Sequence, residues 1–205
     1  MAIVAREPLG VVAEALAPGD LVPRDASLAV VEAERVKVVA AYRFEARERE
    51  RRAASGMAPL TRPDALNLLM ALPLGEPVPA GSLNGRERRA LKALPKGAVV
   101  RRDGLITRLA TRPVHVDMVL VPGRSWESAM EQAERFTPFT ARSVLMDGVL
   151  RRKDEAVMRA DFYGIGLLHV QGDAVEVVVP PSPFVRKRHT VAGWKFLEDV
   201  NRQLP

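Results

Sequence analysis

The order of structural signals in residues 84–111, NGRERRALKALPKGAVVRRDGLITRLAT, most constrains the fold. A short helix is predicted at 85–94, and Pro95-Lys96-Gly97 then breaks it. Two runs that alternate with period 2 flank Asp103-Gly104, a pair favoured in two-residue hairpin turns. The segment holds eight Lys and Arg residues against two acids, a surplus equal to the formal charge of +6 on the whole chain. The sequence thus predicts a basic helix followed directly by a β-hairpin.

A basic helix followed by a hairpin is typical of the recognition helix and wing of a winged-helix domain, which we place at residues 60–112. Basic side chains on such a helix can reach phosphates and guanine edges, and those at the wing tip can reach the backbone or the minor groove. We therefore expect double-stranded DNA as the partner. The alternatives are a solvated helix in an arginine-rich chain, or a surface for protein contact. The DNA-binding candidates are Arg86, Arg88, Arg89, Lys92, Lys96, Arg101, Arg102 and Arg108.

Composition bounds the other possibilities. A chain of 205 residues can form one large domain or two small ones, and 47% apolar residues suffice for a folded core. The absence of cysteine excludes disulfides, iron–sulfur clusters and cysteine-ligated zinc. No apolar run approaches the ~20 residues that span a bilayer, and the N-terminus does not resemble a signal peptide. We expect a bacterial cytoplasmic protein that does not contact membranes.

The N-terminal part predicts a short helix at 9–17 and a short strand at 27–31. Residues 32–55 allow two interpretations. The first is a long helix, apolar at its start and ion-paired later, and we favour a mostly helical structure. The second is a hairpin strand, RVKVVAAY, followed by a charged helix. In either case the alternating charges at 47–52 are expected to face solvent.

Residues beyond 113 predict alternating strands and helices, with the last helix capped by Thr190. Ser125 is expected to cap a helix with one buried face, and Asp147-Gly148 to close the next strand. The residues of that buried face recur at helical spacing: Trp126, Ala129, Met130, Ala133 and Phe136.

Residues 113–180 resemble the core of PD-(D/E)XK (restriction-endonuclease-like) nuclease domains. The similar part is a strand and turn followed by WESAMEQAERFTPFTARSVLMDG, and then a helix ending in Tyr-Gly before a hairpin. Gln132 and Phe136 match the Gln-x-x-x-Tyr helix motif of that superfamily, with Phe in place of Tyr. Some of these small proteins also carry a winged helix within or beside the nuclease-like core. The resemblance implies an α/β fold and, where the site is intact, Mg²⁺-dependent DNA cleavage.

The catalytic pattern of that superfamily is incomplete here. Such nucleases use a carboxylate on one strand and Glu-x-Lys on the next, so that the acids bind Mg²⁺ and the Lys stabilises charge. Asp117 is the acid on the strand before the tryptophan helix, and no Lys follows two residues later. Asp25 could supply the first carboxylate and Glu14 an accessory acid. The histidines share no metal spacing, so we expect no cofactor, or Mg²⁺ if the chain is a nuclease.

Together these patterns predict an α/β (α+β) protein in which a winged helix is inserted in, or packed against, a small nuclease-like core with a mixed sheet. The core would comprise residues 1–58 and 113–185, and a basic tail with a C-terminal helix would follow at 186–205. The expected function is non-enzymatic, regulatory DNA binding with a degenerate nuclease-like lobe. A Mg²⁺-dependent endonuclease using Glu14, Asp25, Asp117 and Gln132 is one alternative, and an assembly or adaptor protein is the other. Either a homodimer or a protein partner is compatible with the C-terminal helix.

Overall fold

A computed structural model describes residues 21–172 and 174–205. The helix expected at 9–17, and Glu14 with it, lies outside these residues. The chain forms two compact units. Among described residues, unit 1 comprises 21–43, 116–187 and Leu204, and unit 2 comprises 44–115, 188–203 and Pro205. This division assigns residues 44–58 and the C-terminal helix to unit 2, which differs from the sequence-based division at 58 and 185.

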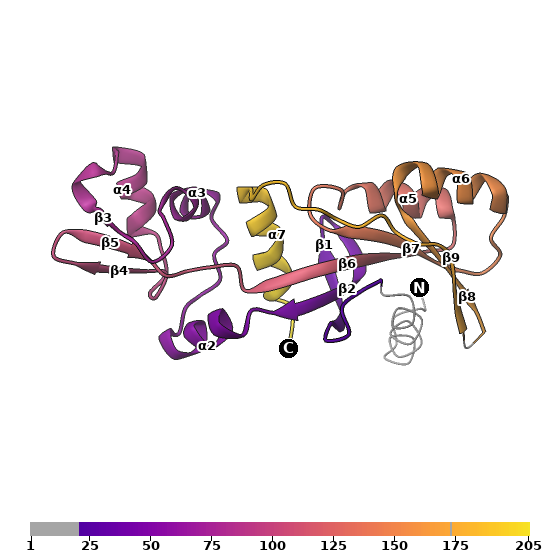
Figure 1. Ribbon diagram of the computed structural model, residues 1–205, viewed down its shortest axis with the longest axis horizontal. Coiled ribbons are helices and arrows are strands. Elements are labelled where there is room, and N and C mark those ends of the chain that lie inside the picture. The colour runs from indigo at the N-terminus through magenta and orange to yellow at the C-terminus, as the bar shows by residue number, and fades with distance from the viewer. Residues whose placement is uncertain (1–20, 173) are drawn as a thin grey trace. The chain divides into compact units, whose positions relative to one another are not determined.

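Unit 1 is built on a mixed six-stranded sheet, so the expected α/β class is confirmed (Figure 1). Its strand order is β1-β2-β6-β7-β8-β9. The middle strands β6, β7 and β8 are parallel, whereas the β1–β2 and β8–β9 pairs are antiparallel. The strands are β1 (Ser27–Ala33), β2 (Val36–Phe44), β6 (Val114–Gly123), β7 (Ala141–Asp147), β8 (Gly166–Gln171) and β9 (Ala174–Val179).

The parallel strands are joined by helix α5 (Trp126–Glu134) and helix α6 (Lys153–Tyr163), which lie on the same side of the sheet (Figure 1). Crossovers between parallel neighbours are right-handed, which places successive helices on one face when the strands follow in order. All five residues of the predicted apolar face of α5 are buried, which confirms that prediction. Ser125 is the residue before the helix, but its side chain makes no capping hydrogen bond.

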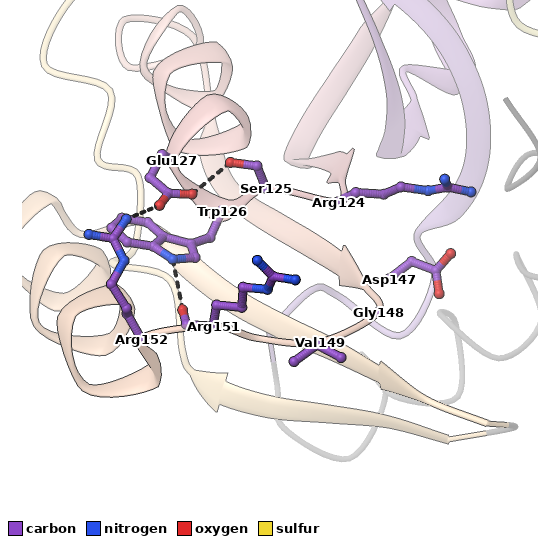
Figure 2. Close-up of a pocket in the computed structure, with 9 residues that line it drawn as sticks. All are labelled: Arg124, Ser125, Trp126, Glu127, Asp147, Gly148, Val149, Arg151 and Arg152. Carbon is purple, nitrogen blue, oxygen red and sulfur yellow. Dashed lines mark hydrogen bonds and ion pairs between the residues drawn. The ribbon is translucent and has the colours of Figure 1, made fainter.

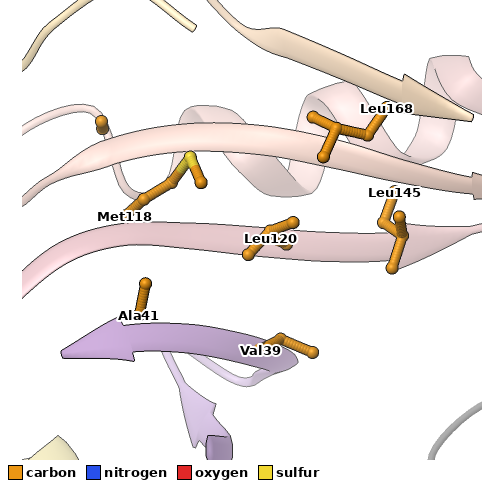
Figure 3. Packing of buried hydrophobic residues seen from close by; sticks show 7 residues of the cluster. Val39, Ala41, Met118, Leu120, Leu145 and Leu168 are labelled. Atoms are coloured by element: carbon orange, nitrogen blue, oxygen red, sulfur yellow. The ribbon is translucent and has the colours of Figure 1, made fainter. Parts of the chain in front are cut away.

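An apolar cluster on the sheet comes from strands far apart in the sequence. Val39 and Ala41 of β2 pack with Met118 and Leu120 of β6, and with Leu168 of β8 (Figure 3). Strand β2 is buried along most of its length, as expected for a strand with neighbours on both sides. This packing holds the N-terminal hairpin to the parallel strands.

The mostly helical interpretation of residues 32–55 is wrong, and the alternative of a strand followed by a helix is correct. Strands β1 and β2 pair around a two-residue turn, Glu34-Arg35, in which both residues have positive φ (48° and 62°). Helix α2 (Ala46–Ser55) begins only after the strand ends. Non-glycine residues seldom adopt this left-handed conformation, so the sequence carries no ordinary signal for the turn.

Unit 2 contains helices and a three-stranded sheet of order β3-β5-β4. Its helices besides α2 are α3 (Pro63–Ala71), the short 3₁₀ helix η1 (Ala80–Ser82), α4 (Gly85–Lys92) and α7 (Val191–Asn201). Its strands are β3 (Pro77–Pro79), β4 (Val99–Arg102) and β5 (Leu105–Arg108). Thr190 caps α7 as predicted, since its hydroxyl accepts a hydrogen bond from the Gly193 N–H at 3.0 Å.

Helix α2 carries the alternating charges at 47–52, and two of them do not face solvent as expected. Glu48 and Arg52 are 4% and 8% exposed. Arg52 donates to Glu48 at 2.7 Å and makes a bidentate contact with Glu198 of α7, at 2.9 and 2.7 Å. Glu198 also accepts from the indole N–H of Trp194 at 3.0 Å and from the Leu60 N–H at 3.2 Å. Helices α2 and α7 are thus joined by a fully hydrogen-bonded ionic cluster.

We expect Glu198→Ala to lower the free energy of unfolding by about 3–5 kcal/mol, because it removes one partner from a buried ion pair. A matched control lies one residue further along α7. Asp199 pairs with Lys195 near the surface, so Asp199→Ala should cost only about 0.3–0.5 kcal/mol. Denaturant titrations followed by circular dichroism measure both. Equal losses in the two variants would contradict a dominant role for the buried cluster.

The cluster also predicts a pH dependence. Burial is the largest influence on Glu48 and would raise the pKa of its carboxyl, but hydrogen bonds and charges from Arg51 and Arg52 outweigh it. The pKa therefore lies below its ordinary value of 4.5. Since the pKa is lower in the folded state, this stabilisation is complete above the unfolded value and is lost as pH falls through the folded value.

Glu48→Gln should therefore be less stable than the unsubstituted protein at neutral pH, and this difference should shrink below about pH 4.5. Denaturant titrations across the acidic range measure the difference. A gap between the two proteins that stays constant on acidification would argue against an ionised Glu48 as its source.

Candidate nucleic-acid interface

Helix α4 starts at a complete capping box. Asn84 accepts hydrogen bonds from the N–H groups of Arg86 and Glu87, both at 2.9 Å, and the Glu87 carboxylate accepts from the Asn84 N–H at 2.8 Å. The Asn84 side chain thus satisfies two backbone N–H groups that have no partner within the helix, and the Glu87 side chain satisfies the N–H of Asn84. These hydrogen bonds fix where the helix begins. Ala90 and Leu91 are buried and pack with Leu68, Leu72, Leu83 and Ile106. The apolar side of α4 is therefore directed into unit 2, and its charged side faces outward.

The basic side chains of this outward side are exposed and largely without acidic partners. Among the described residues, no carboxylate forms an ion pair with Arg86, Arg89, Lys92 or Lys96, and all four are exposed. Like charges three or four residues apart on a helix repel by a few tenths of a kcal/mol unless an anion offsets them. The arrangement thus favours occupation by an anion.

The β4–β5 hairpin continues the same surface. Its two-residue turn, Asp103-Gly104, has positive φ at both positions (50° and 74°), which confirms the predicted hairpin. Arg101 of β4 donates to the carbonyl of Leu91 in α4, so the hairpin and the helix are held together. Arg102 is 85% exposed beside the turn, where Asp103 lies 3.3 Å away.

Arg88 and Arg108, like Arg101, make hydrogen bonds within unit 2. Arg88 is exposed, but its Nε donates to the carbonyl of Leu83 at 2.8 Å. Arg108 donates to the carbonyls of Ala110 and Leu69, at 2.9 and 2.6 Å, and lies 4.9 Å from the ring centre of Trp194. Burial, and then the charge of Arg112, lowers the pKa of Arg108. Arg108 is thus a packing residue in this structure, and the surface proposed below does not include it.

Two of the candidate catalytic acids, Asp25 and Asp117, lie beside an arginine in unit 1. Arg43 of β2 donates to both carboxylate oxygens of Asp117 on β6, at 3.0 and 2.8 Å, and its Nε lies 4.0 Å from Asp25. Asp25 and Asp117 are therefore brought together, as the nuclease hypothesis requires, but around a guanidinium group. Arg43 is not among the residues predicted from the sequence, because it lies in the segment interpreted as helix. Gln132 contacts Ser128 on its own helix at 3.4 Å, and in the described part of the chain it contacts neither aspartate.

Other candidates for metal binding are not supported by the geometry. Within residues 21–172 and 174–205, no group of three or more His, Asp or Glu side chains could hold a metal ion. The histidines have separate partners: His115 contacts Glu45, His169 contacts the Gly148 carbonyl, and His189 contacts Arg112. No helix in the described part is long and apolar enough to cross a bilayer.

Comparisons with known proteins add no assignment: no family model, no curated protein and no solved structure matches this chain.

Proposed function

We propose that unit 2 is a winged-helix domain that binds double-stranded DNA through helix α4 and the β4–β5 hairpin, and that the protein has a regulatory role. One observation carries the proposal: in the described chain, the cations of α4 face solvent without carboxylate partners. The three-stranded sheet and the helix that precedes its hairpin are consistent with this assignment. The proposed contact residues are Arg86, Arg88, Arg89, Lys92, Lys96, Arg101 and Arg102.

The charge distribution explains why DNA is favoured over a protein surface. Some cations elsewhere in the chain are neutralised by neighbouring carboxylates, as Arg52 is by Glu48 and Glu198. The cations of α4 form an exposed row, and the hairpin extends it through the Arg101 contact to Leu91. A row of lysines and arginines can neutralise successive phosphates and release their counterions, which makes binding strongly dependent on salt.

The substitution Arg86→Gln/Arg89→Gln tests this surface. We expect at least tenfold weaker binding to a short fluorescein-labelled DNA duplex, measured by fluorescence anisotropy. The slope of log affinity against log salt should fall by about 2, since each lost phosphate contact contributes about 0.9. The control is Arg24→Gln/Arg47→Gln, which removes the same charge from exposed positions outside the surface. Equal affinity in both variants would overturn the proposal and favour an adaptor role.

We further propose that unit 1 is a nuclease-like lobe without catalytic activity. The bidentate contact of Arg43 with Asp117 supports this, because the guanidinium already supplies the positive charge that a metal ion would bring to the carboxylate. Position 119, where the superfamily pattern has Lys, is a buried Val. In this proposal the lobe serves as a scaffold or a partner surface.

Incubation of supercoiled plasmid with the protein and Mg²⁺ tests the second proposal. We expect no nicked or linear product, and we expect Asp117→Asn to leave the gel pattern unchanged. Nicking that requires Mg²⁺ and disappears in Asp117→Asn would establish the endonuclease alternative. A persistent activity in Asp117→Asn would instead indicate a contaminating nuclease, and repurification should remove it.

A further inference from the structure

A pocket of about 740 Å³ lies in unit 1 where β6 and β7 end (Figure 2). Its walls come from three segments: residues 124–127, which lead from β6 into the first turn of α5, residues 147–149 at the end of β7, and residues 151–152 before α6. None of these residues belongs to the proposed DNA surface or to the Arg43 cluster. The volume falls within the range of small-molecule sites, about 300–1,000 Å³.

Three arginines line this pocket, and two of them have no acidic partner in the described chain. Arg152 pairs with Glu127 and with Glu155, the latter at 2.9 Å. Arg124 and Arg151 are exposed and form no ion pair with any described residue, so no described carboxylate competes with a ligand for their guanidinium groups (Figure 2).

The two carboxylates that line the pocket, Glu127 and Asp147, differ in their partners. A hydrogen bond from the Ser125 hydroxyl at 2.6 Å, together with a backbone hydrogen bond and Arg152, holds the pKa of Glu127 below its ordinary value. Glu127 is therefore ionised and committed to Arg152. Asp147 lies across the pocket and forms no ion pair among the described residues (Figure 2). It is left as an acceptor for a ligand donor, since an ionised carboxylate only accepts hydrogen bonds.

Contacts around Trp126 hold part of the pocket wall in place. Trp126 is buried, and its indole N–H donates to the Arg151 carbonyl at 3.0 Å, which ties the segment before α6 to the start of α5. Arg152 and Arg159 lie 5.5 and 5.4 Å from the centre of the same ring. Arg152 has φ of 50°, an uncommon value for a residue other than glycine. The backbone from which Arg151 extends is thus held against the start of α5.

We propose that this pocket binds a small phosphate ester that carries hydroxyl groups, such as a sugar phosphate or the sugar-phosphate part of a nucleotide. Arg124 and Arg151 bind the phosphate, because guanidinium groups match phosphate oxygens in charge and geometry. Asp147 accepts from a hydroxyl of the ligand. The starts of α5 and α6 border the pocket and add favourable partial charge for the phosphate. The proposal concerns unit 1 and does not depend on DNA binding by unit 2.

Calorimetric titration of the full chain with ribose 5-phosphate, ribose and inorganic phosphate tests this site. Ribose 5-phosphate should bind at least tenfold more tightly than either of the other two. In NMR spectra the indole N–H signal of Trp126 should shift with ligand, whereas that of Trp194, which contacts Glu198 in unit 2, should stay in place. Absence of ribose 5-phosphate binding, or equal binding of inorganic phosphate, would overturn the proposal.

Two variants separate the pocket from the DNA surface. Arg124→Gln/Arg151→Gln should weaken ribose 5-phosphate binding at least tenfold. Its DNA affinity should fall no more than that of the control Arg24→Gln/Arg47→Gln. Arg86→Gln/Arg89→Gln should do the reverse. If Arg124→Gln/Arg151→Gln binds ribose 5-phosphate as well as the control does, the pocket is not the binding site. Circular dichroism confirms that each variant is folded.

Discussion

The buried carboxylate of Glu198 is the interaction on which unit 2 depends. It satisfies the Arg52 guanidinium, the Trp194 indole and the Leu60 N–H at once, and so joins α2, α7 and the segment before α3. Removing charge from water costs several kcal/mol per ion, and only a fully hydrogen-bonded arrangement offsets that cost. The apolar cluster that contains Leu60, Leu66 and Trp194 is built around this centre. A second apolar cluster, which contains Leu91 of α4 and Ile106 of β5, supports α4 and its hairpin.

Arginine serves in this chain both as an internal packing residue and as an exposed cation. Its burial and its hydrogen-bond partners distinguish the two roles. Arg52 and Arg108 donate to several internal acceptors and act as packing residues. Arg43 neutralises an aspartate that in an active nuclease would be expected to hold a metal ion. Arg86 and Arg89 have no acidic partner among the described residues, and neither do Arg124 and Arg151. A count of arginines therefore says little about binding until the internal acceptors have been located.

Much of the fold was predictable because local signals were strong. Asp103-Gly104 marked the β4–β5 hairpin, and the spacing from Trp126 to Phe136 marked the buried side of α5. The β1–β2 hairpin was only the less favoured interpretation, because its turn, Glu34-Arg35, adopts left-handed geometry without glycine or asparagine. For the candidate site, the exposed cations of α4 followed from the sequence. The roles of Arg43 and Arg108 did not, since each has a hydrogen-bond partner far away in the sequence, at 74 and 39 residues respectively.

Both units are discontinuous in sequence, and this has a consequence for biosynthesis. Glu198 of helix α7 follows Arg52 by 146 residues, so the ribosome makes Arg52 long before its partner. Until α7 emerges, Arg52 and Glu48 have no Glu198 to complete their cluster. A nascent chain that already carries α4 and the β4–β5 hairpin would thus lack the complete cluster. Premature termination before α7 should yield a product cleared by proteolysis rather than a functional fragment.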